Sequence, residues 1–287
     1  MDKLQKRYGL LTAICMVVGI VIGSGVFFKA QTILQKTGGN MPLGILAWII
    51  GGVIMLTCLL AFSVMAQKFE KVNGIVDYAE ACVGSRYAYY IGWFLSIIYY
   101  PCLTSVLAWL SARYTLVFIT SVAPNFPLLG LGAAAGAETI LGPECMSLAM
   151  FYLCCAYAVN ALSPKLAGKL QVSTTIIKLI PLFLMAIAGI VVGIANGTLA
   201  NNFKTLADVG AANATGSPLL ASVCATAFAY EGWIIATSIN AELKDAKKNL
   251  PRALVIGAII IIATYIFYYV GVAGGATNQE LIDSGAT

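Results

Sequence analysis

The sequence predicts an all-α membrane protein, and two observations support this fold class. Hydrophobic residues make up 60% of the chain, charged residues only 10%, and the mean hydropathy is +0.88. A water-soluble domain of 287 residues cannot hide that much apolar surface. The apolar residues also form runs that, at about 1.5 Å per helical residue, are long enough to cross roughly 30 Å of hydrocarbon.

Seven such runs are expected to be transmembrane helices of a single membrane domain covering residues 1–287. The first resembles a signal peptide because basic residues precede it, but its apolar core is long and no small-residue cleavage site follows. We therefore keep it as a helix. The runs cover residues 10–28, 43–66, 88–110, 145–162, 170–195, 219–240 and 253–273.

The basic residues predict the orientation of these helices. Twelve of the seventeen Lys and Arg residues lie on the side of the membrane that holds the amino terminus; Lys29, Lys36 and Lys204 lie on the other side, and Arg113 and Lys178 lie within or beside spans. Because cytoplasmic loops are enriched in Lys and Arg, the amino terminus is expected in the cytoplasm of a multi-pass plasma-membrane protein. After seven crossings, residue 287 is expected outside. The net charge of +5 then reflects topology and implies no nucleic-acid partner.

The connecting segments contain no sign of a further folded domain. Residues 68–90 mix charged, aromatic and apolar side chains, which favours an amphipathic helix on the cytoplasmic interface. Residues 120–142 and 197–217 are expected to be outer loops, and residues 277–287 a short polar tail.

The residue types argue against an enzyme. The chain has no histidine, so it lacks the usual proton shuttle, the commonest metal ligand and the base of most catalytic triads. Its eight cysteines lie within or beside spans, without the spacing of a zinc site or of an extracellular disulfide framework. We expect no metal and no cofactor.

The first run contains three glycines and a serine between residues 19 and 27. Glycine lowers the cost of leaving helical geometry, and an unwound turn in lipid is tolerated only where protein, water or a solute satisfies its backbone. Its free amides would favour an anion such as a carboxylate. The alternative is close helix packing, since small residues four apart, such as Gly19 and Gly23, let backbones touch.

The sixth run places an acidic residue at mid-membrane. Glu231 lies twelve residues after Leu219 and is followed by Gly232, where a second break is expected. Carboxylates at that depth usually face a cavity or partner and mark a transport path. The alternative is a protonated or hydrogen-bonded packing carboxyl. The aromatic residues Phe228, Tyr230 and Trp233 are suited to gate a pocket, although such residues are also ordinary membrane core.

The fifth run carries Lys178 roughly 12 Å from its cytoplasmic end. Two interpretations remain open. A flexible lysine can extend most of that distance to the interface, or it can act as a fixed internal cation that takes the place of a coupling metal ion, which argues against sodium dependence.

These motifs resemble the amino acid, polyamine and organocation transporters, in particular the L-type amino acid exchangers. The resemblance covers essentially the whole chain and rests on GIVIGSGVFF in the first run, EKVNGIVDYAEACVG before the third, KLIP in the fifth, and FAYEGW followed by AELKDAKKNLPRA at the sixth. The first and last motifs, in this order and at this separation, are together specific.

The resemblance implies a LeuT-type fold of two inverted five-helix repeats, in which discontinuous helices one and six hold the substrate. Amides around Gly23, Ser24 and Gly25 would bind the substrate carboxylate, carbonyls around Val21, Phe228 and Glu231 its amino group, and Lys178 would stand in for sodium. Tyr230 and Trp233 would shape the side-chain pocket. The implied substrate-binding residues are Val21, Ile22, Gly23, Ser24, Gly25, Phe228, Ala229, Tyr230, Glu231, Gly232 and Trp233.

The expected function is sodium-independent transport, by exchange, of neutral L-amino acids. Members of the family have about twelve helices, so these residues would hold the first repeat and two helices of the second, without the later helices. Residues 120–142 lack a cysteine, so no disulfide-linked heavy subunit is expected. Two alternatives stay open, a non-transporting membrane fragment and a seven-helix receptor or light-driven protein. The last run lacks the lysine that a retinal protein needs, and the charge bias opposes a receptor's outside amino terminus.

Overall fold

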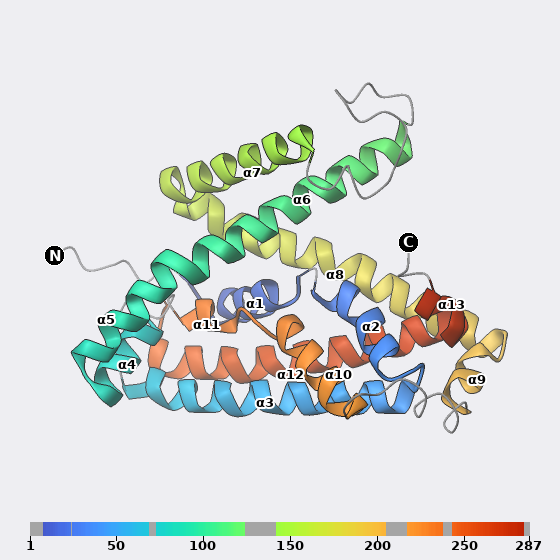
Figure 1. Cartoon of the computed structure of the whole chain (residues 1–287). Helices are drawn as coiled ribbons and strands as arrows, with labels where there is room; N and C mark the ends of the chain where they lie inside the picture. Colours follow the sequence, from blue (N-terminus) through green and yellow to red (C-terminus); the bar gives the residue numbers. More distant parts are fainter. Residues whose placement is uncertain are drawn as a thin grey trace. The chain divides into compact units, whose positions relative to one another are not determined.

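The computed structural model is almost entirely helical in the residues that it describes, which are 8–23, 25–68, 73–123, 142–204, 217–237 and 243–283 (Figure 1). A single isolated β-bridge among them joins Tyr8 to Leu243. In order, the helices are α1 (Leu10–Val21), α2 (Gly25–Lys36), α3 (Met41–Lys68), α4 (Ile75–Val83), α5 (Ser85–Phe94), the π-helical turn η1 (Leu95–Tyr99), α6 (Tyr100–Val122), α7 (Pro143–Leu162), α8 (Pro164–Ala195), α9 (Thr198–Lys204), α10 (Pro218–Ala229), α11 (Trp233–Ala236), α12 (Ala246–Gly275) and α13 (Asn278–Asp283).

Within the described part of the chain, six helical stretches are long and apolar enough to cross a membrane, and the bent pair α1 and α2 makes a seventh if it is one span. The all-α membrane class expected from the sequence is therefore confirmed. The longest stretch joins α5, η1 and α6 into 38 residues, Ser85–Val122. Large apolar side chains such as Phe118 and Ile177 are more than 60% exposed, as suits helices surrounded by lipid.

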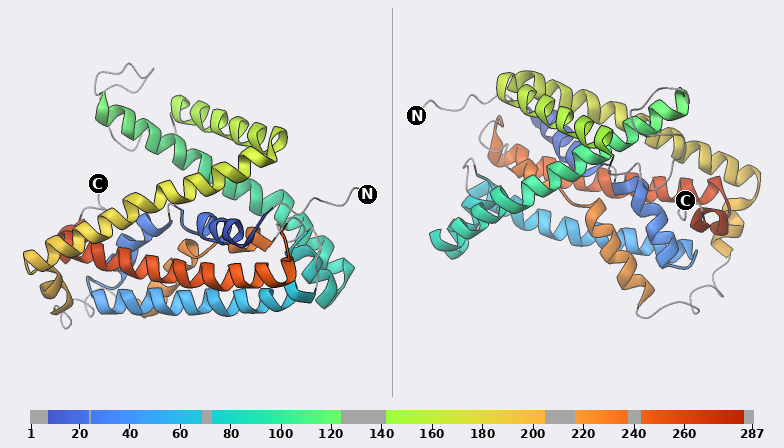
Figure 2. Two further views of the ribbon diagram at one scale, coloured as in Figure 1. Left: turned by 180° about the vertical axis from the view of Figure 1, so that it is seen from behind. Right: turned by 45° about the horizontal axis from the view of Figure 1, so that its top comes forward.

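The chain divides into two compact units, of which the first comprises Met1–Tyr78 and Gln171–Thr287. Here α3 and α12 run side by side along their length, and α1 and α10 lie against this pair (Figures 1 and 2). Trp48 of α3 packs at 5.1 Å between ring centroids against Tyr265 of α12, and both side chains are fully buried. These aromatic residues form the centre of the core.

Glycines let helices of the first unit approach at backbone distance. A Cβ atom added to Gly271 of α12 would overlap the backbone of Ala186 in α8, and one on Gly274 would overlap the carbonyl of Gly189. Inside a bilayer the hydrophobic effect does not hold helices together. Small residues at such crossings allow the close van der Waals packing that does.

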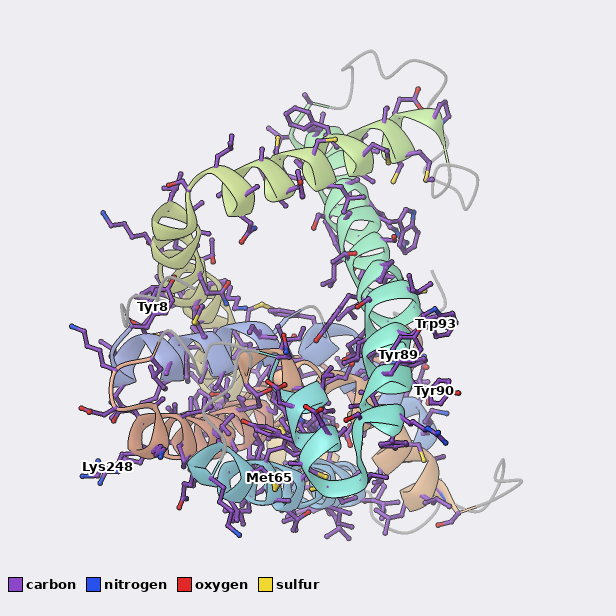
Figure 3. All side chains as sticks on the ribbon, turned by 90° about the vertical axis from the view of Figure 1, so that its left-hand side faces the viewer. Tyr8, Met65, Tyr89, Tyr90, Trp93 and Lys248 are labelled. Atoms are coloured by element: carbon purple, nitrogen blue, oxygen red, sulfur yellow. The ribbon has the colours of Figure 1, made fainter. Side chains whose placement is uncertain are left out.

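The second unit comprises Ala79–Leu170 and contains α5, α6 and α7. Its small buried cluster consists of Ala108, Ala112, Cys145 and Ala149, and the hydroxyls of Thr115 and Tyr152 hydrogen-bond at 2.9 Å across α6 and α7. The side chains of Tyr89, Tyr90 and Trp93 project outward from α5 (Figure 3), and they are 70%, 67% and 51% exposed.

Three span boundaries expected from the sequence are wrong: the helices of the first and third runs end later, and α12 begins at Ala246 and not at residue 253. The first stretch continues beyond residue 28 to Lys36, because Ala30, Ile33 and Leu34 continue a buried stripe at helical spacing. Lys29 and Lys36 therefore lie on α2 and not in a loop. The third stretch passes residue 110 and ends at Val122. Its polar residues are satisfied within the helix, since the Ser111 hydroxyl donates to the carbonyl of Leu107 at 2.8 Å.

Two segments expected to be irregular contain short helices. The outer loop begins with α9, and the polar tail forms α13. The Asn202 side chain of α9 donates to the carbonyls of Ala273 and Ala276 at 2.7 and 2.9 Å, which caps the end of α12. The segment expected to be an interfacial helix contains α4 and the beginning of α5.

Candidate functional site

The first glycine-rich segment interrupts its helix. α1 ends at Val21, Ile22 has an extended backbone with ψ of 92°, and α2 begins at Gly25 in a direction bent by 48°. Ser24 lies outside the described residues. The end of α1 and the start of α2 therefore leave carbonyls and amides without partners in their own helix.

The second interruption lies in FAYEGW. α10 ends at Ala229, Tyr230 and Glu231 lie outside helical geometry, and α11 begins at Trp233. Gly232 has φ of 103°, a backbone conformation that residues other than glycine rarely adopt. Glycine at this position therefore sets the point where the backbone turns.

The two interruptions cross each other at close range. A Cβ atom on Gly25 would lie 3.0 Å from the Cα atom of Ala229, and one on Gly232 would lie 3.0 Å from Cγ2 of Ile20. The beginning of α2 thus lies on the end of α10, and the beginning of α11 lies on the end of α1. Residues about 200 positions apart in the sequence form one site.

The backbone beside this crossing borders open space. Among the described residues, no atom beyond its own neighbours lies within 4 Å of the Cβ position of Gly23, in contrast to Gly25. Close helix packing explains Gly19 and Gly25, each of which touches another helix, but it does not explain Gly23. An unwound backbone that faces open space is the arrangement that a bound solute requires.

The ammonium of Lys178 is directed into the first unit, where it donates a hydrogen bond to the main-chain oxygen of Gly19. Gly19 lies in the last turn of α1, whose carbonyls carry partial negative charge. Thr175, one turn earlier on α8, also faces α1, and its hydroxyl lies 2.6 Å from the carbonyl of Gln171 in its own helix and 3.4 Å from that of Cys15 in α1. The Lys178 side chain thus extends toward α1, and its function as an internal cation stays a prediction.

The aromatic residues of FAYEGW differ in their surroundings. The Tyr230 hydroxyl donates to the carbonyl of Trp48 at 2.9 Å, and Trp233 packs edge-on against Phe62 at 5.0 Å, so both belong to the core. Phe228 is 44% exposed, and the Lys29 ammonium lies 5.2 Å from the centre of its ring. Glu231 is half-buried in the non-helical segment.

Sequence reasoning did not identify Tyr265 of α12. Its fully buried hydroxyl lies 3.0 Å from the carbonyl oxygen of Val21 and 2.7 Å from that of Ala229. A tyrosine within the apolar run of α12 was the available signal, because a phenolic hydroxyl buried in a membrane needs an acceptor.

The sequence matches a known protein family. A family model described as amino acid permease matches residues 8–287. The chain belongs to the amino acid permease family. The resemblance inferred from the motifs is thereby confirmed, and membership of a transporter family together with several apolar helices makes the chain a multi-pass membrane protein.

Relatives of this permease chain include exchangers from bacteria and transporters from mammals. It is 30% identical to the serine/threonine exchanger of Bacillus subtilis over 99% of this chain and 58% of the exchanger. It is 26% identical to the mouse Asc-type amino acid transporter 1 and 28% identical to the mouse b(0,+)-type amino acid transporter 1, over 99% of this chain and 50% and 54% of those proteins. The chain thus spans about half the length of these curated relatives.

Proposed function

We propose that this chain contributes the substrate site of a sodium-independent exchanger of neutral L-amino acids. The observation that carries the proposal is the crossing of two interrupted helices, Gly25 on Ala229 and Gly232 on Ile20, beside open space at Gly23. The names of its relatives, which are exchangers and transporters of amino acids, support it.

The helix ends at the crossing offer opposite charges to a zwitterion. The amides of Gly23 and Gly25 at the start of α2 would bind the substrate carboxylate, because a helix amino terminus carries partial positive charge. The amide of Ser24, which lies outside the described residues, is included in this proposal. The ends of α1 and α10 present carbonyls, at Val21 and from Phe228 to Glu231, to the α-amino group. Neither end discriminates among side chains.

Sodium independence is proposed from Lys178. Its ammonium already donates a hydrogen bond to the carbonyl of Gly19 near the end of α1. A bound sodium ion would use the same type of ligand. A fixed lysine supplies this charge without a gradient, so transport would proceed by exchange of one amino acid for another. The LeuT-type repeat, the cytoplasmic amino terminus and the absence of a disulfide-linked heavy subunit belong to the same proposal.

The test is counterflow in proteoliposomes. The purified chain is reconstituted with unlabelled L-alanine, L-serine or L-leucine inside, and uptake of the same labelled amino acid is measured in sodium and in choline buffer. Equal accumulation in both buffers is expected, with none in liposomes that lack internal substrate.

Other outcomes would decide between the remaining functions. Uptake that requires sodium contradicts the role of Lys178. Absence of counterflow, together with no thermal stabilisation by any of the three amino acids, favours a non-transporting membrane fragment. A ligand that stabilises the protein but is never translocated favours a receptor-like function.

A further inference from the structure

One exposed face of α12 changes from basic to apolar within its first turns. Ile256 and Ile259 are 40% and 56% exposed, and Lys248 and Arg252 are exposed as well. These four positions follow one another at spacings of four, four and three residues, which places them on the same side of the helix. Two cations therefore lie directly at the end of an apolar stripe that suits contact with acyl chains.

The neighbouring helix α3 repeats this pattern. Leu60 and Val64 are 47% and 52% exposed, and Lys68, the last residue of the helix, is exposed and follows at the same spacing of four. A stripe of exposed apolar side chains on α3 thus also ends in a cation.

The two basic ends lie at the same end of the helix pair, because α3 and α12 run antiparallel. A Cβ atom on Gly44 would overlap the hydroxyl of Tyr269, and one on Gly52 would overlap the side chain of Ile262. Residue numbers therefore fall along α12 as they rise along α3. The last residue of α3, Lys68, consequently lies at the end where α12 begins.

The cations at the start of α12 lack an anionic partner within the described residues. Lys244, Lys247, Lys248 and Arg252 are all exposed, and no ion pair between described residues includes them. The one acidic residue between positions 243 and 252 is Asp245, so positive charge predominates. Figure 3 shows the Lys248 side chain extending away from the ribbon. Like charges three or four residues apart on a helix repel, and an external anion would relieve this repulsion.

An anionic phospholipid has both parts that this face requires. Its phosphate carries the negative charge that Lys and Arg beside a membrane attract. Its acyl chains provide the apolar surface that Ile256 and Ile259 need. A soluble phosphate would satisfy the cations alone, whereas a phospholipid satisfies the cations and the apolar stripe together.

We propose that the start of α12 binds an anionic phospholipid, with the phosphate on Lys248 and Arg252 and an acyl chain along Ile256 and Ile259. Lys68 at the same end of α3 adds to the positive charge that attracts the headgroup. The inference goes beyond amino acid transport, because it gives the chain a lipid ligand on a face that contains none of the residues implied in substrate binding.

The experiment places a photocrosslinking residue, p-benzoyl-phenylalanine, at position 256 of the full chain. The protein is reconstituted in nanodiscs with equal amounts of phosphatidylglycerol and phosphatidylcholine that carry the same acyl chains, and the lipid adducts are quantified by mass spectrometry. We expect about tenfold more adduct with phosphatidylglycerol. K248Q/R252Q should bring the two adducts to within about twofold of each other, whereas K248R/R252K should keep the preference, because it keeps both charges.

Two controls separate this site from net charge and from general lipid contact. K36Q/K204Q removes two exposed cations from the ends of α2 and α9 and should leave the preference unchanged. The same photocrosslinking residue at position 194 of α8, where Ile194 is 67% exposed and no basic residue lies in the last turn, should form both adducts equally.

Several results would overturn the inference. Equal adducts at position 256 in the wild-type background, or an undiminished preference in K248Q/R252Q, would show that these cations select no lipid. Loss of the preference on addition of excess glycerol phosphate would show a site for soluble phosphate. Adducts to protein in place of lipid would show that a polypeptide covers this face.

A second measurement does not depend on the folding of K248Q/R252Q. The crosslinking experiment is repeated in the wild-type background at rising salt concentration, because salt screens exposed charges. We expect the preference for phosphatidylglycerol to fall toward equality at high salt. A preference that salt leaves unchanged would contradict recognition of the headgroup by exposed cations.

Discussion

Lys178 of α8 donates its hydrogen bond to Gly19 within the last turn of α1, so a cation lies at the negative end of an interrupted helix. The bond joins residues 159 positions apart. It satisfies a carbonyl that the interruption deprives of its intrahelical donor.

Replacement of Lys178 by methionine should therefore weaken both the fold and transport. Loss of the donor leaves the Gly19 carbonyl without this partner at a cost of about 1–3 kcal/mol, and it removes the charge that we propose takes the place of a metal ion. We expect a lower thermal midpoint and at least about tenfold slower counterflow. K169M, at an exposed position on the same helix, is the matched control. Wild-type rates in K178M would show that the amine has no part in transport.

Glu231 is expected to act on substrate affinity more than on stability. It lies half-buried in the non-helical segment between α10 and α11, next to Gly232, whose backbone lies at the crossing. E231Q keeps the shape and removes the charge, so the Kd of neutral amino acids should change by about tenfold, since hydrogen bonds to charged groups contribute about 1.5–3 kcal/mol. E80Q on the exposed side of α4 is the control. Identical uptake kinetics in E231Q would remove this residue from the site.

A methyl group at Gly23 should block ligand without disturbing the protein. No atom of the part of the chain that the structure describes, apart from the neighbouring residues, lies within 4 Å of the position it would take, so G23A should melt like wild type. If the open space holds substrate, one added carbon there should weaken binding about tenfold or more. G275A, which also enters open space but at the end of α12, should change neither property. Normal binding by G23A would place the substrate elsewhere.

The close packing of α12 against α8 should require glycine at position 271. Valine at Gly271 would overlap the backbone of Ala186, which cannot move without separating the helices. Overpacking of this kind costs about 1–3 kcal/mol. G271V should lower the thermal midpoint in detergent, whereas G275V should not, and equal midpoints would contradict the close approach.

The contribution of Glu280, at the start of α13, to the stability of the protein should depend on pH. The backbone N–H and the hydroxyl of Thr277 donate to its carboxylate at 2.9 and 2.8 Å, and they lower its pKa below the usual value. Because the folded state has the lower pKa, the stabilisation is present above the unfolded-state pKa and is lost as pH falls through the folded-state value. T277V should raise the pKa of Glu280 in an NMR titration, and an unmoved titration curve would contradict this cause.

Much of the helical layout could be predicted from the sequence, because apolar runs in lipid admit few structures. Span ends were less certain. Hydropathy falls at Lys29 and at Ser111, yet α2 continues on its buried stripe and α6 satisfies its hydroxyls internally. The glycine and FAYEGW segments predict breaks in two helices, since glycine lowers the cost of leaving helical geometry.

The contacts across the site could not be predicted. The pairing of Gly25 with Ala229 depends on how α2 and α10 approach in space, which sequence spacing does not encode. Lys178 could be assigned to a helix but not to its acceptor. Tyr265 was missed because its role depends on two carbonyls that only the folded chain brings within reach of one hydroxyl.

The helical stretch Ser85–Val122 is longer than the hydrocarbon layer of a bilayer is thick. Its 38 residues extend about 57 Å at about 1.5 Å each, nearly twice the roughly 30 Å of hydrocarbon. Helix tilts in bilayers reach about 40°, which does not absorb this hydrophobic mismatch. Part of this helical stretch must therefore lie in the headgroup region. Its amino-terminal end carries the amphipathic side chains that favour this region, Arg86, Tyr89 and Tyr90. Longer acyl chains should immerse more of it, so we expect the depth of this helix in the bilayer to change with membrane thickness.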